Sequence, residues 1–327
     1  MTALLQLRGL RVAIGAARPV DGVDLDVHAG EVLGIVGESG SGKSLTLKSI
    51  LRLLPPAAVV SGQVRWLGQD MAAMDEAALR RIRGRQIAAV FQEPMTALNP
   101  VLRVGLQITE SLAGHLGLRG AAARRRAVEL LDLVGIPDAR RRLDSYPHEF
   151  SGGMRQRAMI AIALAAGPQV LLADEPTTAL DVTIQDQILR LLLRLKDELS
   201  MAVVLVTHDL GVVAGTCDRV AVMYAGTVVE TGATTTVLAR PAHAYTLGLL
   251  RSLPDAAAVR HRLLGIPGTP PDPARLPPGC CFAPRCGFAV PACDAAAPGV
   301  RATEADGAPL TACIRAGLVQ DQTAAAA

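Results

Sequence analysis

The sequence contains few aromatic residues, little surplus charge and no long apolar run. Aromatic side chains make up 2% of its 327 residues, and 33 basic residues against 30 acidic ones leave a net charge of +3. So small a charge attracts nucleic-acid phosphates only weakly, and no nucleic-acid partner is expected. The longest uncharged stretch, Ala158 to Ala173, is interrupted by Gly167-Pro168, whereas a membrane-spanning helix needs roughly 20 apolar residues.

The amino terminus lacks a basic segment followed by an apolar one, so nothing in it directs export and a cytoplasmic protein is expected. Half of the residues are apolar, which suffices for one large core and a smaller appendage. Lysine is scarce, since the chain holds only Lys43, Lys48 and Lys196, and each of them therefore stands out. Of the six cysteines, Cys217 stands alone and the other five lie at or after Cys280.

Three apolar runs predict buried strands, over residues 32–36, 170–173 and 202–206. The first run leads into a glycine-rich loop and a helix that is expected to continue until Pro55-Pro56. A further helix is expected from about Thr183 to Leu199. Strands and helices that alternate in this way are typical of an α/β protein with a parallel sheet.

Two segments differ from this pattern. Residues from about Glu93 to Pro147 have mostly helical periodicity, with Gly135 as a stop signal, and predict a helical insertion. After Gly232 the composition shifts to alanine, proline, glycine and cysteine, which predicts a linker that leads to a small C-terminal module.

The octet from Gly37 to Ser44 has the spacing of a phosphate-binding loop, with two glycines around four residues and then Lys-Ser. Glycine lets successive backbone N–H groups turn toward one anion, and the helix that follows offers its positive end to the same charge. Lys43 would reach the β- and γ-phosphates, and the Ser44 hydroxyl would hold Mg²⁺. The loop predicts a nucleoside triphosphate as ligand.

Polar side chains follow the other two strands where each is expected to end. Asp174 and Glu175 are adjacent acids that would repel each other unless a cation or substrate relieves them. Asp174 would belong to the Mg²⁺ shell, and Glu175 would be the general base for the attacking water. His208 could donate to the γ-phosphate.

The segment Ser151-Gly152-Gly153-Met154 precedes a predicted helix, so Ser151 can be its N-cap and the glycines can let a phosphate approach the helix N–H groups. This would be a second anion site in a chain that already has one. We therefore expect it to serve the nucleotide of a neighbouring copy, with two such domains facing head to tail.

These motifs together resemble the nucleotide-binding subunit of ATP-binding-cassette (ABC) transporters. Residues 91–100, 243–250 and 279–286 are similar to the oligopeptide, dipeptide and nickel importer branch of that family. The resemblance implies an α/β fold with a P-loop NTPase core of the ABC type, a helical insertion and a small Cys-rich C-terminal extension. It places a RecA-like core with an antiparallel β subdomain in 1–92 and 156–232, a helical signature subdomain in 93–155, and the extension in 233–327.

The resemblance also assigns site residues. Gln92 would sense the γ-phosphate and complete the Mg²⁺ shell of Ser44 and Asp174, and Asp181 would join Ser151, Gly152, Gly153 and Met154 at the partner's ATP. Many family members place an aromatic side chain under the adenine where this sequence has Ile14, so the stacking contact would be weaker. Contacts to the rest of ATP would come from Gly37, Glu38, Ser39, Gly40, Ser41, Gly42, Lys43, Ser44 and Leu45.

The implied function is an ATPase that energises an importer for di- and oligopeptides, at the cytoplasmic face of the inner cell membrane. Its implied partners are two transmembrane permease subunits, a second, non-identical ATPase subunit and an extracytoplasmic solute-binding protein. The alternatives are a nickel importer ATPase of the same branch and a non-transport ABC ATPase. A P-loop kinase or GTPase would leave Ser151-Gly152-Gly153 unexplained.

The clustered cysteines predict a metal site, because a reducing compartment disfavours disulfides. Their spacing departs from the close pairs of zinc modules, yet thiolate-only sites suit zinc as well as iron–sulfur clusters, and unligated structural cysteines are a third option. The resemblance to importer subunits with a similar cysteine set implies a [4Fe–4S] cluster at Cys280, Cys286, Cys293 and Cys313, with Cys281 outside it.

Overall fold

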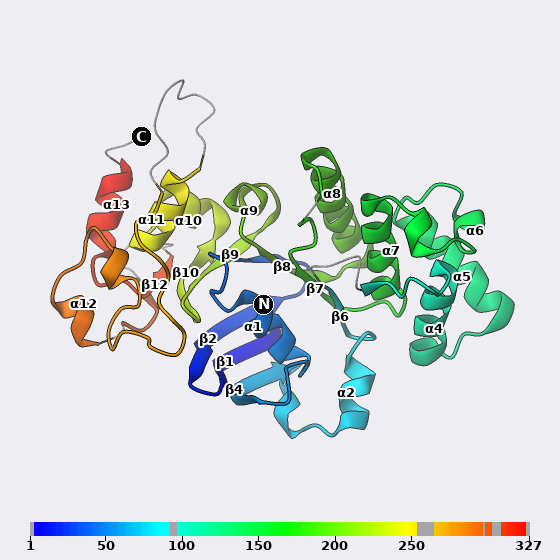
Figure 1. Cartoon of the computed structure of the whole chain (residues 1–327), viewed down its shortest axis with the longest axis horizontal. Coiled ribbons are helices and arrows are strands. Elements are labelled where there is room, and N and C mark those ends of the chain that lie inside the picture. Colours follow the sequence, from blue (N-terminus) through cyan, green and yellow to red (C-terminus); the bar gives the residue numbers. More distant parts are fainter. Residues whose placement is uncertain are drawn as a thin grey trace. The chain divides into compact units, whose positions relative to one another are not determined.

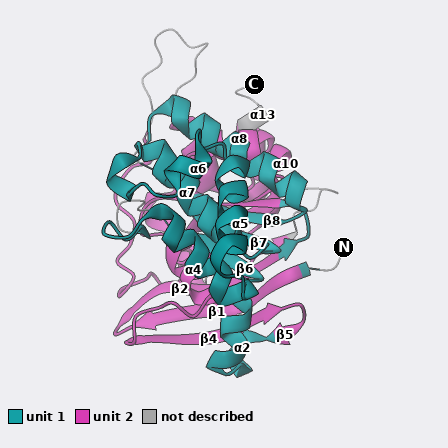
Figure 2. Cartoon of the chain, turned by 90° about the vertical axis from the view of Figure 1, so that its right-hand side faces the viewer, with its two compact units in different colours: residues 1–3, 27–31, 70–206 teal, residues 4–26, 32–69, 207–327 magenta. Residues whose placement is uncertain are grey.

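The computed structural model describes residues 3–91, 97–178, 180–253, 265–296, 298–302 and 309–324. The chain divides into two compact units, one made of residues 1–3, 27–31 and 70–206 and the other of residues 4–26, 32–69 and 207–327 (Figure 2). Each unit contains its own strands and helices, and each is described by itself.

The first unit has a short parallel sheet and a group of helices (Figure 1). Strand β7 (Val170–Asp174) pairs in parallel with β6 (Ile87–Val90) on one side and with β8 (Ala202–Thr207) on the other. Every residue of β7 and β8 is buried. Because both faces of this sheet are covered, its strands are continuous apolar runs, as the sequence predicted.

The helices of this unit are α2 (Glu76–Ile82), α4 (Val104–Leu116), α5 (Gly120–Leu133), α6 (Ala139–Arg142), α7 (Gly152–Leu164) and α8 (Val182–Leu199), with 3-10 turns η1 (Met71–Ala73) and η2 (Pro147–Glu149). The predicted helical insertion is therefore confirmed over its described residues. Its inner faces are apolar, with Ile108, Leu112 and Leu131 fully buried.

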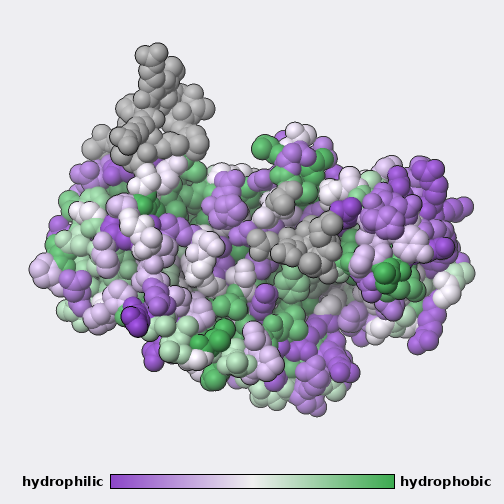
Figure 3. Space-filling view, in the orientation of Figure 1, coloured by the Kyte–Doolittle hydropathy of each residue, from purple (hydrophilic) through white to green (hydrophobic). Residues whose placement is uncertain are grey.

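The arginine runs of the insertion lie on its outer surface. Arg124, Arg125 and Arg126 are exposed on α5, and Arg124 forms an ion pair of 2.6 Å with Asp144. Figure 3 shows hydrophilic side chains over much of the region of α4, α5 and α6. These runs therefore lie on a solvated face of the helix.

The second unit contains two sheets. One has the order β2 (Ala17–His28), β1 (Ala3–Ile14), β4 (Ala58–Trp66) and β5 (Gln69–Asp70), with β1 and β4 antiparallel. In the other, β3 (Val32–Val36) is parallel to β9 (Arg219–Tyr224), which pairs in antiparallel fashion with β10 (Thr227–Ala233). The short strands β12 (Leu310–Thr311) and β11 (Arg301–Ala302) extend that sheet beyond β10.

The helices of the second unit are α1 (Lys43–Ile50), α9 (Leu210–Thr216), α10 (Thr234–Ala239), α11 (Ala244–Arg251), α12 (Ala292–Ala295) and α13 (Ala316–Ala324), with the 3-10 turn η3 (Ala283–Arg285). Helix α1 ends before the predicted Pro55-Pro56, because Arg52 takes a left-handed φ of 51° that stops it. The linker predicted directly after Gly232 is wrong, since α10 and α11 lie there. The reason is burial, because Tyr245 and Thr246 of α11 are fully covered and hold this segment against the unit.

Within the described part of the chain, no helix combines the length and the apolarity that crossing a bilayer requires.

Candidate functional site

The predicted phosphate loop lies between β3 and α1 in the second unit. All five residues of β3 are buried, and α1 begins at Lys43, so the predicted order of strand, loop and helix is confirmed. Gly42 is the N-cap of α1 with a φ of 100°, a conformation that side chains with a Cβ rarely adopt. At Gly37 an added Cβ would overlap the carbonyl oxygen of Met223 on β9. Both glycines are therefore required by the backbone path of the loop.

The Lys43 ammonium lies over the start of this loop. Its Nζ donates to the carbonyl oxygens of Gly37 at 2.7 Å and Glu38 at 2.9 Å, and it is 3.3 Å from the Ser41 hydroxyl. Lys43 and Ser41 are both buried. A fixed ammonium group beside the N-terminus of α1 favours the binding of an anion at that place.

The paired acids lie at the end of β7 in the first unit. Asp174 is 3% exposed and lies opposite Val206 of β8 in the parallel ladder. Glu175 follows it with a left-handed φ of 47°, which costs a residue other than glycine roughly 1–3 kcal/mol and is common at functional sites. The Thr178 hydroxyl donates to Glu175 Oε2 at 2.8 Å and orients the carboxylate.

The segment predicted as a second anion site lies at the N-terminus of α7, also in the first unit. Ser151 is its N-cap and accepts from the Met154 N–H at 3.3 Å. Ser151 and Gly152 are exposed. Asp181 caps the neighbouring helix α8 in the same way, accepting from the Ile184 N–H at 2.9 Å. A Cβ on Gly153 would lie 2.8 Å from Ile184 Cγ2, so the starts of α7 and α8 are in direct contact.

The remaining predicted residues lie at the ends of strands or outside the described chain. Ile14 is the last residue of β1 and is half-buried. His208 directly follows β8 and is exposed, and Asp209 caps α9 beside it. Gln92 lies outside the described residues.

The residues that hold Glu38 were not among those predicted from the sequence. Arg285 forms a two-pronged ion pair with both Glu38 carboxylate oxygens, at 2.7 and 3.0 Å, and the Tyr245 hydroxyl accepts from the Glu38 N–H at 2.8 Å. The one sequence feature that could have indicated this region is the scarcity of aromatic residues. Two of the three tyrosines and one of the four phenylalanines meet here, since Tyr224, Tyr245 and Phe282 have ring centroids 4.6–5.4 Å apart.

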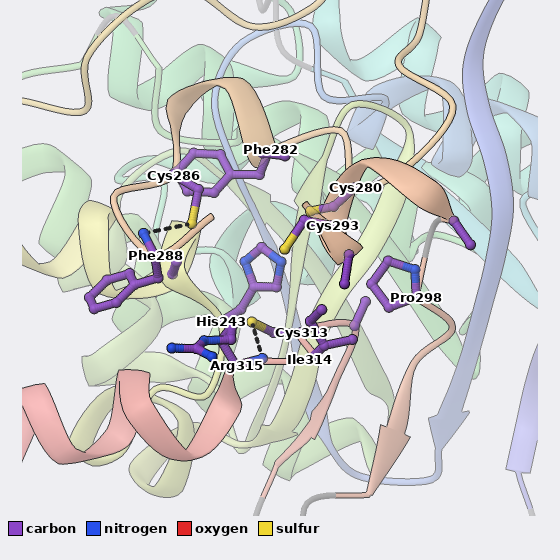
Figure 4. A pocket seen from close by; sticks show the side chains of 15 residues that line it. His243, Cys280, Phe282, Cys286, Phe288, Cys293, Pro298, Cys313, Ile314 and Arg315 are labelled. Carbon is purple, nitrogen blue, oxygen red and sulfur yellow. Dashed lines mark hydrogen bonds between the residues drawn. The ribbon is translucent and has the colours of Figure 1, made fainter. Parts of the chain in front are cut away.

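The four cysteines predicted as ligands line one cavity of the second unit, and Cys281 does not (Figure 4). The walls are otherwise mostly apolar, and the His243 ring lies among the sulfurs in this view. Burial raises the pKa of the Cys280, Cys286 and Cys313 thiols. Hydrogen bonds from backbone N–H groups to these sulfurs lower the same pKa values, but by less. Burial also lowers the pKa of His243 to about 4, which keeps its imidazole neutral.

This arrangement of side chains does not by itself form a metal site. Among the described residues, no group of three or more His, Cys, Asp or Glu side chains is placed to hold a metal ion. The cavity measures about 20 Å³, space for about one water molecule. The donor set fits a thiolate-bound group, but the cavity would have to widen to admit an iron–sulfur cluster.

Two protein families match the chain. The family described as ABC transporter matches residues 20–178, and the one described as oligopeptide/dipeptide transporter, C-terminal region, matches residues 229–293. A protein of Brucella abortus named for peptide import and ATP binding is 55% identical over 280 residues, which are 85% of this chain and 84% of that protein. A Brucella melitensis protein named in the same way is 54% identical over 312 residues, which are 90% of this chain and 92% of that protein.

Solved structures of ATP-binding cassettes are also similar. The dimeric post-hydrolysis state of MJ0796 with ADP and phosphate aligns with a TM-score of 0.62 at 31% identity, over 70% of this chain and 98% of that one. The protein cbiO1 of Clostridium perfringens, part of the ABC transporter complex cbiONQ, aligns with a TM-score of 0.63 at 28% identity, over 73% of this chain and 92% of that one.

Proposed function

Because this chain belongs to the ABC transporter family, we propose that it is the ATP-hydrolysing subunit of an importer for di- and oligopeptides. The observation that carries the ATPase assignment is the Gly37–Ser44 loop between a buried strand and α1, with Lys43 fixed over it. The C-terminal match and the names of the relatives favour peptides over nickel as cargo. A non-transport role has no comparable support.

The phosphates of ATP bind to the Gly37–Ser44 loop, and Ile14 contacts the base. Ser44, Gln92 and Asp174 are the residues that would hold Mg²⁺, which supplies positive charge beside the β- and γ-phosphates. Glu175 accepts the proton of the attacking water as that water attacks the γ-phosphorus and ADP leaves. His208 donates to the γ-phosphate.

Hydrolysis takes place between two cassettes. Ser151 and Gly152 are exposed at the N-terminus of α7, Gly153 and Met154 follow them in its first turn, and Asp181 lies at the start of the adjoining α8. These groups bind the γ-phosphate of a partner's ATP. MJ0796 in its ADP and phosphate state is likewise described as a dimer.

The importer contains two transmembrane permease subunits, a second, non-identical ATPase subunit and an extracytoplasmic solute-binding protein. This subunit lies peripherally at the cytoplasmic face of the membrane. Residues 1–92 and 156–232 are its ATP-binding core, 93–155 its helical signature subdomain, and 233–327 its C-terminal extension. Gln92 reports the γ-phosphate to that subdomain, whose outer surface contacts a permease.

The need for a partner cassette predicts that the isolated subunit hydrolyses ATP poorly. Its specific activity should rise with protein concentration, and assembly with the permeases in proteoliposomes should raise it further. Phosphate release by a monomer verified by light scattering gives the baseline. Robust hydrolysis at a rate independent of concentration would contradict the shared site.

Uptake of labelled dipeptide but not nickel by the proteoliposomes would support peptides as the cargo, and uptake of nickel alone would overturn that assignment.

The cysteines of the extension hold a [4Fe–4S] cluster. Support comes from the four thiols that share one cavity, and from the N–H groups of Phe288 and Arg315, each 3.4 Å from the sulfur of Cys286 or Cys313. Hydrogen bonds to sulfur are a feature of iron–sulfur sites. A single zinc ion, which takes four thiolates at about 2.3 Å, is the alternative that a measurement of iron and zinc content decides.

Anaerobically purified protein is expected to be brown and to contain about four irons per chain. Cys293→Ser should lose the iron, whereas Cys281→Ser, whose side chain lies outside the cavity, should keep it and serves as the matched control. Colourless protein with one zinc per chain, even after reconstitution with iron and sulfide, would refute the cluster.

A further inference from the structure

Arg285 connects the C-terminal extension to the phosphate loop. Its guanidinium donates to Glu38 Oε2 and Oε1 at 2.7 and 3.0 Å, to the Tyr224 hydroxyl at 3.2 Å and, through Nε, to the Pro267 carbonyl at 2.8 Å. The Arg285 side chain is 5% exposed, whereas that of Glu38 is 29% exposed. So many directed contacts fix the guanidinium in one position, and both oxygens of Glu38 are held by it.

The position of Arg285 is built by its surroundings rather than by Glu38 alone. Its guanidinium carbon lies 5.7 Å from the Tyr224 ring centre and 5.9 Å from that of Phe282. Successive turns from Cys280 to Cys286, with the Arg285 N–H donating to the Phe282 carbonyl at 2.9 Å, fix its backbone. The cation is therefore placed before any nucleotide arrives.

The backbone of Glu38 is held as well as its side chain. Its N–H donates to the Tyr245 hydroxyl of α11, and its carbonyl accepts from Lys43 Nζ. The Gly37 carbonyl accepts from the same ammonium. The first two residues of the loop are thus fixed by groups from α1, α11 and the extension.

The ion pair between Arg285 and Glu38 matters because of the charge on Glu38. Glu38 is an acid inside a loop that is proposed to bind a triphosphate, and an unpaired carboxylate there would repel the ligand. A neutral or basic residue would avoid the conflict, but Glu38 also supplies the anchor that ties the loop to the extension. Arg285 cancels the charge and keeps the anchor.

We propose that Arg285 is a positioning residue for ATP: from the C-terminal extension it neutralises Glu38 and holds the phosphate loop in its binding conformation. The inference rests on the proposed assignment of Gly37–Ser44 as the phosphate loop. It assigns the extension a part in nucleotide affinity that is separate from its cysteine cavity.

The test measures equilibrium binding of ATP and ADP to the full-length chain, with melting temperature as the check on folding. Arg285→Met should weaken ATP binding by about ten-fold, as expected for one uncompensated charge beside the phosphates. Glu38→Gln removes the charge and the anchor together, so it should weaken ATP binding less than Arg285→Met does, by about three-fold. The double variant should recover to the same level. Arg275→Met, an exposed arginine of the same extension, is the matched control and should not change affinity.

Recovery in the double variant is a readout that a merely structural role would not produce. In the assembled transporter, the Arg285→Met change should appear as a higher KM for ATP with kcat nearly kept. Because breaking a buried ion pair can impair folding, Arg285→Lys is measured beside it. That variant keeps the charge but loses the two-pronged contact, and about three-fold weaker binding is expected.

Wild-type affinity in both Arg285 variants would overturn the inference, and so would a double variant as weak as Arg285→Met. The Lys43→Ala variant distinguishes failure of the role of Arg285 from failure of the proposed phosphate loop. If Lys43→Ala binds ATP normally, the proposed phosphate loop is wrong. If it loses ATP while the Arg285 variants bind normally, only the role of Arg285 is wrong.

Discussion

Replacing Glu175 by glutamine is expected to slow ATP turnover of the assembled transporter by about 10²- to 10⁴-fold, the range for loss of a general base. The change keeps the size of the side chain and an oxygen that can accept from the Thr178 hydroxyl, which lies 2.8 Å from Oε2 in the native site. The left-handed φ of 47° is no harder for glutamine than for glutamate. What is lost is the ability to take a proton from water.

ATP binding should survive this substitution, because the phosphate loop belongs to other elements of the chain. With hydrolysis blocked and binding kept, ATP should hold two cassettes together, so Glu175→Gln should elute as a dimer in ATP and as a monomer in ADP. Glu198→Gln on the exposed end of α8 is the control, since its ion pair with Arg194 at 3.2 Å is a surface contact worth little. Near-normal turnover in Glu175→Gln would remove Glu175 from the role of base.

Local signals sufficed for the strands and loops that carry the predicted site. The runs 32–36 and 170–173 are apolar at every position, which is how a strand covered on both faces must look. The structure agrees to the residue for β3 and extends β7 by only Asp174. The glycine spacing before Lys43 then placed the loop, because few other residues can follow that backbone path.

Contacts between distant segments were beyond the reach of those signals. Arg285 and Glu38 are 247 positions apart, and nothing local in either segment marks the other as its partner. The segment after Gly232 was predicted as a linker because its composition shifts to alanine, proline, glycine and cysteine, yet α11 forms where Tyr245 is buried against the unit. The left-handed φ of Glu175 could not be predicted from the sequence either. It depends on the pairing of β7 with β8, beside which the Glu175 N–H donates to the Val206 carbonyl.

Placing a side chain on Gly153 is the second change expected to have a large effect. A Cβ there would lie 2.8 Å from Ile184 Cγ2, closer than real contacts allow, so in Gly153→Ala the Ile184 side chain or the start of α7 or α8 must shift. A displacement of about 1 Å in a phosphate-binding group can cost about 10²-fold in rate. We expect a loss of that order in turnover of the assembled transporter, with ATP binding to the isolated subunit unchanged.

The neighbouring glycine supplies the control for that effect. At Gly152 the nearest atom to an added Cβ is Leu180 Cδ2 at 3.4 Å, an ordinary contact, so Gly152→Ala should fold with little strain. Truncating Ile184 to alanine in the Gly153→Ala protein removes the overlap, and so tests whether the loss of turnover comes from the packing of α7 against α8. The Gly153→Ala/Ile184→Ala variant should regain melting temperature because the overlap is gone. Its turnover should rise as well, because the N–H groups at the start of α7 return to their native position. Turnover that stayed low after the melting temperature had recovered would contradict displacement of α7 as the cause of the loss.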